Sequence, residues 1–146
     1  MENETMRYLL TNILLIGMLC LPNANGESTV KLKKELASQH FTGVLEGNVR
    51  FTTLGQLSCG SSSLQVFFYE WEESTPPGEA VHSSYRVILM HGATYLGSYV
   101  VADKPSLQGD ELRFPYTENG NSIRCGIEGA PPKKVLLDGE NISLAK

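Results

Sequence analysis

The sequence predicts an all-β fold, a small antiparallel sandwich or barrel of about seven to nine short strands with room for one short N-terminal helix. Three observations lead to this prediction. Apolar and polar residues alternate with a period of two from residue 41 onward, as they do in strands. Turn-forming Gly, Pro, Asn and Asp residues recur about every 8 to 14 positions. No helical period extends beyond residue 40, which disfavours an α/β architecture.

The chain opens with a pattern that is typical of a secretory signal peptide. Arg7 precedes an apolar run over residues 8–21, and the small residues Ala24 and Gly26 follow. A positive start, a short apolar centre and a small-residue exit define such leaders. The run is shorter than the roughly 20 apolar residues that a membrane-spanning helix needs. We therefore expect residues 1–26 to be cleaved, leaving no stable membrane span.

Cys20 offers a second interpretation of the leader, in which this residue is lipidated and anchors the mature protein. Lipoprotein signals place a small residue directly before the cysteine, whereas Leu19 stands there. Cleavage after Gly26 is therefore preferred. A start at Met6 would also improve the leader, because it would remove two acidic residues from the end that should be positive.

Residues 27–146 are expected to form a single β-rich domain, since a chain of about 120 residues can bury one core. Without the leader, which contributes Arg7 and two glutamates, the 12 basic and 16 acidic residues become 11 and 14. Neither a basic stripe for nucleic acid nor a polybasic patch for a membrane is present. The expected partner is therefore an envelope or extracellular protein or a small ligand, met in the periplasm or after secretion.

Cys59 and Cys125 predict one disulfide bond, because paired cysteines in an exported domain are kept oxidised. The bond would close a loop of about 65 residues and tie the first third of the domain to the last. The alternative is a pair of free buried thiols. There is no Cys-X-X-Cys motif and no Cys/His spacing typical of zinc ligands, so we expect no metal site and no cofactor.

The start of the domain has the pattern of a short helix. Residues 28–38 carry Leu32 and Leu36 four positions apart, which places both on one helix face, and a serine at the start could act as the cap. A first strand at residues 30–32 is the alternative.

The predicted strands follow in order, each bounded by a turn or a proline. They occupy residues 47–57, 63–73, 85–91, 95–101, 111–114 and 123–127, and a hairpin covers residues 133–145. Segment 63–73 is apolar on both faces, which predicts a central strand covered on both sides. The pairs Asn119-Gly120 and Asp138-Gly139 are expected to form tight hairpin turns, because they tolerate the positive φ angles of a type I′ turn.

Aromatic residues in two of these strands suggest a binding face. Tyr95 and Tyr99 should lie on one face of their strand with Gly97 between them, where a flat ligand or another backbone could approach closely. Tyrosine suits contact surfaces because it is large, stiff and amphipathic. We expect these three residues, together with Trp71, to bind the ligand or partner. The alternative interpretation is aromatic packing within the sheet core.

A group of acidic residues around Trp71 offers a different function. Glu70 and Glu72 share a strand face about 7 Å apart, with Glu73 next to them, and two acids at about 5 to 9 Å can cleave a glycosidic bond. Charges near a strand end equally protect a sheet edge from pairing with another chain. None of the three histidines accompanies a serine-nucleophile motif, so we assign no catalytic residue.

These features favour a non-catalytic binding module of the cell envelope, inhibitor-like, that holds a protein or a small ligand. In size, leader and one expected disulfide the chain is similar to small envelope β domains such as lysozyme inhibitors and immunity proteins, a likeness of class that no motif carries. Two alternatives stay open. One is a small envelope hydrolase that uses the carboxylates near Trp71, and the other is a structural or assembly component of the envelope.

Overall fold

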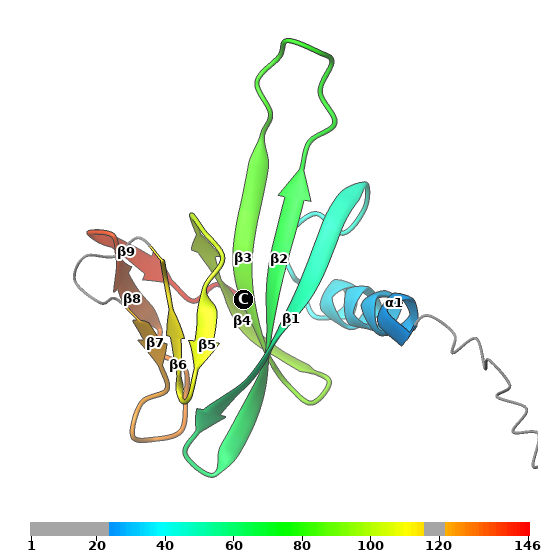
Figure 1. Ribbon diagram of the computed structural model, residues 1–146. Helices are drawn as coiled ribbons and strands as arrows, with labels where there is room; N and C mark the ends of the chain where they lie inside the picture. Colours follow the sequence, from blue (N-terminus) through cyan, green and yellow to red (C-terminus); the bar gives the residue numbers. More distant parts are fainter. Residues whose placement is uncertain (1–23, 116–121) are drawn as a thin grey trace, which may run out of the picture.

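A computed structural model describes residues 24–115 and 122–146 of the chain. Within these ranges it contains one helix and nine strands in three antiparallel sheets, which confirms the predicted all-β fold. The elements are α1 (Ala24–Ser38), β1 (Asn48–Cys59), β2 (Ser62–Glu72), β3 (Ser83–His91), β4 (Thr94–Val101), β5 (Ser106–Gln108), β6 (Glu111–Arg113), β7 (Ser122–Arg124), β8 (Lys134–Leu137) and β9 (Glu140–Ser143) (Figure 1). Residues up to 23, Cys20 included, and the Asn119-Gly120 turn lie outside the described residues.

The four-stranded sheet forms the middle layer of the molecule. Its strands follow chain order, β1-β2-β3-β4, and each neighbouring pair is antiparallel. Helix α1 covers one face, while the sheet β5-β6-β7 and the hairpin β8-β9 lie on the other (Figure 1). Each face of the central sheet therefore packs in a hydrophobic cluster of its own.

The apolar residues of β2 and β3 explain this layering. Val66 and Phe68 of β2 pack in the cluster beneath β5–β9. Phe67 and Tyr69, which alternate with them, pack in the cluster beneath α1. The four consecutive buried residues 87–90 of β3 divide between the two clusters in the same way. The expectation of a strand covered on both sides is confirmed, because an apolar run stays dry only with a layer on each face.

Helix α1 confirms the helical interpretation of residues 28–38 and begins earlier, at Ala24. Leu32 and Leu36 are 6% and 0% exposed, so one apolar stripe of two leucines docks the helix on the sheet. Past the last turn, His40 adopts a φ of 61°, a left-handed conformation that commonly ends helices.

Two sets of hydrogen bonds hold the end of α1 and the following loop against the sheet. The side-chain amide of Gln39 donates to the carbonyl oxygen of Ala93 at 2.7 Å, and its side-chain oxygen accepts from the backbone N–H of Tyr95 at 2.8 Å. The hydroxyl of Tyr69 donates to the carbonyl oxygen of Val44 at 2.7 Å. The segment between α1 and β1 is thereby fixed to the central sheet.

Cys59 and Cys125 form the predicted disulfide bond, with their Cα atoms 5.1 Å apart. The bond connects the last residue of β1 to the segment just after β7. Cys59 is fully buried in the cluster beneath β5–β9, and Cys125 packs against that cluster. The disulfide bond therefore links the three-stranded sheet β5-β6-β7 covalently to the central sheet.

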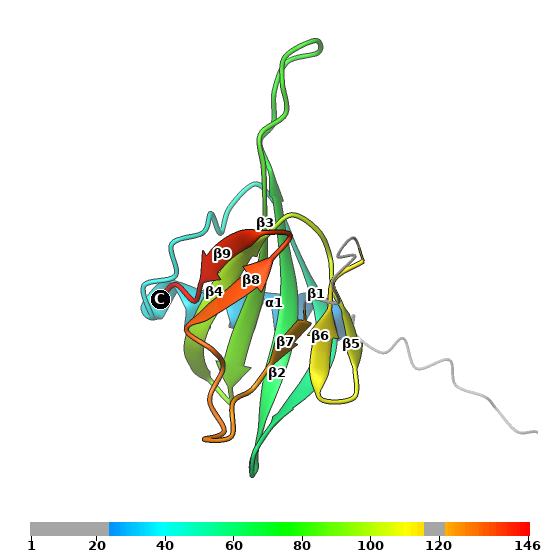
Figure 2. The ribbon, with the colours of Figure 1, turned by 90° about the vertical axis from the view of Figure 1, so that its left-hand side faces the viewer.

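Strands β2 and β3 continue into a long loop, residues 73–82, which we call the β2–β3 arm. The arm projects well beyond the rest of the domain (Figures 1 and 2). Its neck is closed by a hydrogen bond of 2.8 Å from the backbone N–H of Glu73 to the carbonyl oxygen of His82. Every residue of the arm except Thr75 is exposed, so the packing of the domain makes little use of these side chains.

Candidate functional site

Tyr95 and Tyr99 lie on opposite sides of the central sheet, so the face that they were expected to share is not formed. Tyr95 belongs to the cluster beneath α1, and Tyr99 belongs to the cluster beneath β5–β9. The register of β3 against β4 shifts between Leu89 and Met90, which changes the alternation of side chains along β4. Both tyrosines are also buried, at 5% and 0% exposed. The expectation of an exposed tyrosine face was therefore wrong.

The hydroxyl groups of these tyrosines bond within the interior. That of Tyr95 lies 3.0 Å from Oγ of Ser98 and 3.1 Å from the carbonyl oxygen of Ala145, and both atoms can accept its proton. That of Tyr99 donates to the carbonyl oxygen of Pro132. Burial raises the pKa of both hydroxyls, and the bond to Ser98 offsets part of the rise at Tyr95. Both side chains therefore remain neutral donors inside the fold.

The space beside Gly97 is filled by the C-terminal segment of the chain itself. A Cβ atom at Gly97 would lie 2.7 Å from Cγ of Leu144 and 2.9 Å from the carbonyl oxygen of Ala145. The neighbouring Ser98 exchanges two backbone hydrogen bonds with Ala145, at 2.8 and 2.9 Å. Of the two uses that the sequence allows for Gly97, the structure shows the close approach of another backbone.

Trp71 lies on the α1 side of the central sheet, partly buried against the cluster there. Its chain neighbours Glu70 and Glu72 point to the other side, because successive residues of a strand alternate between faces. The indole therefore does not flank these carboxylates, and no common surface unites Trp71 with both tyrosines.

Glu70 and Glu72 share an ion pair with Arg50 of β1. Nη2 of Arg50 lies 3.6 Å from Oε1 of Glu70 and 4.0 Å from Oε1 of Glu72. The three side chains line a hollow of about 450 Å³ beside the start of β1. Both carboxylates thus face an arginine of the neighbouring strand, Arg50, whose register places it directly opposite Glu70. The arrangement supports cross-strand ion pairing, and Glu73 stands apart, exposed in the neck of the arm.

A buried carboxylate that the sequence analysis did not single out lies in the three-stranded sheet. Glu111, 4% exposed, accepts hydrogen bonds from the side chains of Arg124, Arg113 and Ser122. These donors, Arg124 first, lower the pKa of Glu111 from 4.5 to about 2. Because Glu111 and Arg124 are directly opposite in the register of β6 and β7, the cluster stabilises this strand pair.

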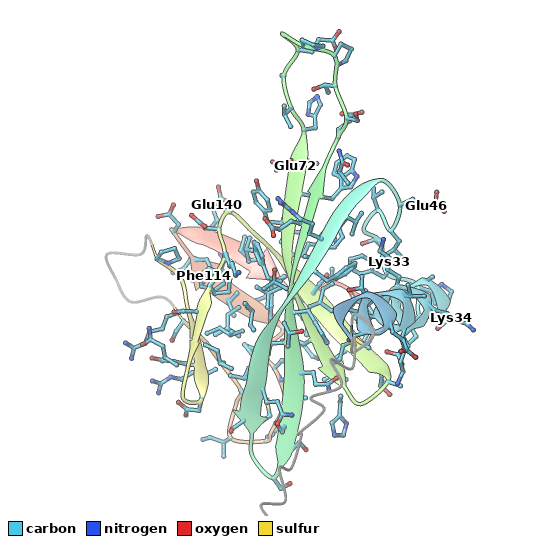
Figure 3. The ribbon with its side chains drawn as sticks, turned by 45° about the vertical axis from the view of Figure 1, so that its right-hand side comes forward. Lys33, Lys34, Glu46, Glu72, Phe114 and Glu140 are labelled. Carbon is cyan, nitrogen blue, oxygen red and sulfur yellow. A yellow bond between two sulfur atoms is a disulfide. The ribbon has the colours of Figure 1, made fainter. Side chains whose placement is uncertain are left out.

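A pocket of about 380 Å³ lies where the end of β4, the end of β6 and the β8–β9 hairpin meet, and we call it the hairpin pocket. Four of its apolar side chains are Val101, Phe114, Leu137 and Ile142. Three carboxylic acids also line it: Asp103, Asp138 and Glu140. Figure 3 shows Glu140 and Phe114 on the same side of the molecule, on β9 and beside β6 respectively.

The turn of the β8–β9 hairpin places two of these acids. Asp138 and Gly139 have φ angles of 51° and 80°, which confirms the expected tight turn. The turn sets Asp138 and Glu140 on either side of Gly139 at the tip of the hairpin. The sequence analysis missed the pocket because its walls come from three segments that only the topology brings together.

Among residues 24–115 and 122–146, no group of three or more His, Cys, Asp and Glu side chains is placed to hold a metal ion. In that part of the chain, no helix combines the length and the apolar character needed to cross a membrane. The side chains of His40, His82 and His91 are exposed and lie in separate parts of the fold.

Comparison with protein-family models, with curated proteins and with solved structures gives no match to this chain.

Proposed function

We propose that this chain is an exported, non-catalytic binding module that engages a partner protein through the β2–β3 arm. The observation that carries the proposal is the projection of an exposed loop from a well-packed, disulfide-linked domain (Figures 1 and 2). A loop on a rigid scaffold is a common way to present binding residues. An arm that stands clear of its own domain has the shape to enter a cleft in another protein, as an inhibitor loop does.

The arm is locally ordered in spite of its exposure. Besides the bond that closes its neck, the backbone N–H of Glu79 donates to the carbonyl oxygen of Pro76 at 3.2 Å, which forms a turn at the tip. Pro76 and Pro77 fix two successive φ angles and so reduce the freedom that binding would have to remove. The exposed side chain of Val81 adds apolar contact area. A partner would therefore meet a partly preorganised surface.

The acidic side chains of the arm indicate which charge the partner's binding surface should carry. Its ionisable side chains are Glu73, Glu79 and His82, and it carries no lysine or arginine. Opposite potentials favour encounter and orientation, so we expect a neutral or basic cleft in the partner.

Export is the second part of the proposal. The disulfide bond between Cys59 and Cys125 supports it, since such bonds persist in oxidising compartments and are rare in the cytosol. The leader pattern in residues 1–26 is in agreement with the same route.

The test removes the arm without disturbing the sheet. Residues 74–81 are replaced by Asn-Gly, a two-residue turn that fits between Glu73 and His82, whose backbones are already hydrogen bonded. The oxidised domain, this shortened variant and Ile127→Ser serve as baits for proteins of the producing organism's envelope extract and medium. Ile127 is a matched control, because its side chain is fully exposed in a different loop.

We expect one partner to be retained by the natural domain and by Ile127→Ser, and to be at least about tenfold depleted on the shortened variant, as loss of a central contact requires. Equal retention by all three baits would contradict the role of the arm. If the natural domain retains no protein beyond those that an unrelated bait also retains, the binding function itself is contradicted.

A further inference from the structure

Part of the wall of the hairpin pocket belongs to the buried core of the domain. Val101 and Leu137, which line the pocket, are each 7% exposed and belong to the buried cluster that contains Cys59. Phe114 and Ile142 pack against the same cluster. The pocket wall is thus continuous with the core that the disulfide bond fastens, and a volume of about 380 Å³ falls in the range of small-molecule sites.

The charge of the pocket has one sign. Asp103, Asp138 and Glu140 line it, and none of the lining residues that the structure describes is basic. None of these three carboxylates forms an ion pair with another residue in the described part of the chain. The nearby Lys104 has its Nζ 5.9 Å from the centre of the Phe68 ring. The pocket therefore combines an apolar wall with uncompensated negative charge.

The lining residues of the pocket indicate which kind of cation fits it best. Among the described residues these three carboxylates do not form a group placed to hold a metal ion, and the apolar wall beside them suits an organic cation better. Among the described residues of the lining, Phe114 is the one aromatic residue, whereas quaternary ammonium groups are held by cages of several aromatic rings. A primary ammonium group instead offers three N–H donors, which suit carboxylate acceptors spread around a pocket.

We propose that the hairpin pocket binds a small primary amine with an apolar body. The body lies against Val101, Leu137 and Ile142, where its burial is favourable, and the ammonium group stays among the carboxylates with part of its hydration. A free small molecule fits better than a protein segment, because the lining comes from three separate chain segments and does not run along one strand. The site shares no residue with the β2–β3 arm, so it is independent of the proposed partner binding.

The test compares three probes of equal length on the full oxidised domain: hexylamine, 1-hexanol and hexanoate. Two-dimensional amide NMR at neutral pH follows each titration, with the backbone signals of Ala102 and Ile142 as reporters of the pocket. We expect hexylamine to bind about tenfold more tightly than 1-hexanol, and hexanoate to produce no shifts there, as electrostatic complementarity requires. Added salt should weaken the binding of hexylamine and leave that of 1-hexanol unchanged.

The double variant Asp138→Asn/Glu140→Gln locates the site. Asparagine tolerates the positive φ at position 138, so the turn is kept. We expect this variant to bind hexylamine about as weakly as 1-hexanol, whereas Glu46→Gln, an exposed carboxylate elsewhere (Figure 3), should bind it like the natural chain. The proposal is overturned if hexylamine binds no more tightly than 1-hexanol, if it does not bind at all, or if the double variant binds it unchanged.

Discussion

Leu144 packs directly against Gly97, which lies on β4 at the edge of the central sheet. A Cβ atom at Gly97 would be 2.7 Å from Cγ of Leu144, closer than any side chain could tolerate. The φ of Gly97 is +147°, a conformation that side-chain-bearing residues rarely adopt. Both features let the C-terminal segment reach the edge of β4, where Ala145 pairs with Ser98.

Gly97→Ala should destabilise the domain by about 3 kcal/mol, because backbone strain and overpacking act together at this position. Urea denaturation followed by circular dichroism measures the loss. Gly92→Ala is the matched control: Gly92 also has a positive φ, 58°, but a Cβ there would meet nothing within 4 Å. Its loss should be about 1 kcal/mol, the strain alone. Equal losses in the two variants would contradict the packing of Leu144 on Gly97.

The disulfide bond should contribute much of the stability. For a separation of 66 residues, the chain-entropy model gives a loss of about 4 kcal/mol on reduction. Urea denaturation with and without reductant measures this difference in the natural chain. The double variant Cys59→Ala/Cys125→Ala should be insensitive to reductant. A natural chain whose midpoint does not move when reductant is added would show that the bond does not form in solution.

Leu36 should anchor helix α1 to the sheet. Its side chain is 0% exposed, so Leu36→Ala would leave a cavity and destabilise the domain by about 3 kcal/mol. Val30, on the same helix, is 68% exposed, and Val30→Ala should change stability by less than about 0.5 kcal/mol. Thermal denaturation of the two variants measures both values. A loss at Leu36 as small as that at Val30 would mean that α1 is not docked in solution.

Glu111 should make stability depend on acid pH. Its pKa in the folded chain, about 2, lies below the ordinary value of 4.5, so the charged carboxylate stabilises the fold above pH 4.5. This contribution is lost as the pH falls from 4.5 toward 2. Glu111→Gln should therefore be less stable than the natural chain at neutral pH, and the difference should shrink over that window. Glu46→Gln provides the control, and a difference that stays constant with pH would refute the role of the Arg113 and Arg124 pairing.

Local patterns were sufficient to predict most of the elements. The alternation of apolar residues gave the long strands, and the Asp138-Gly139 pair gave the last hairpin turn, because both depend on a few neighbouring residues. Strand β5, with three residues, was missed, since no period can be seen in so short a segment. The pairing of Cys59 with Cys125 followed from there being two cysteines in the domain.

Long-range features could not be predicted in the same way. The register shift between β3 and β4 moves Tyr95 and Tyr99 to opposite sides of the sheet, and a strict period of two contains no sign of it. Glu111 looks like any acid near a turn until β7 brings Arg124 opposite to it. Candidate site residues were misplaced for the same reason: sequence spacing describes one strand, whereas a binding surface is made by several.

The cystine touches only one of the two clusters that the central sheet separates. The other cluster, which contains the leucines of α1 and their aromatic neighbours, includes neither cysteine. Reduction of the cystine would therefore loosen the cluster beneath β5–β9, which forms the wall of the hairpin pocket. The cluster beneath α1 would keep its own contacts. Amine binding and redox state would then be thermodynamically linked, so a bound amine would make the cystine harder to reduce.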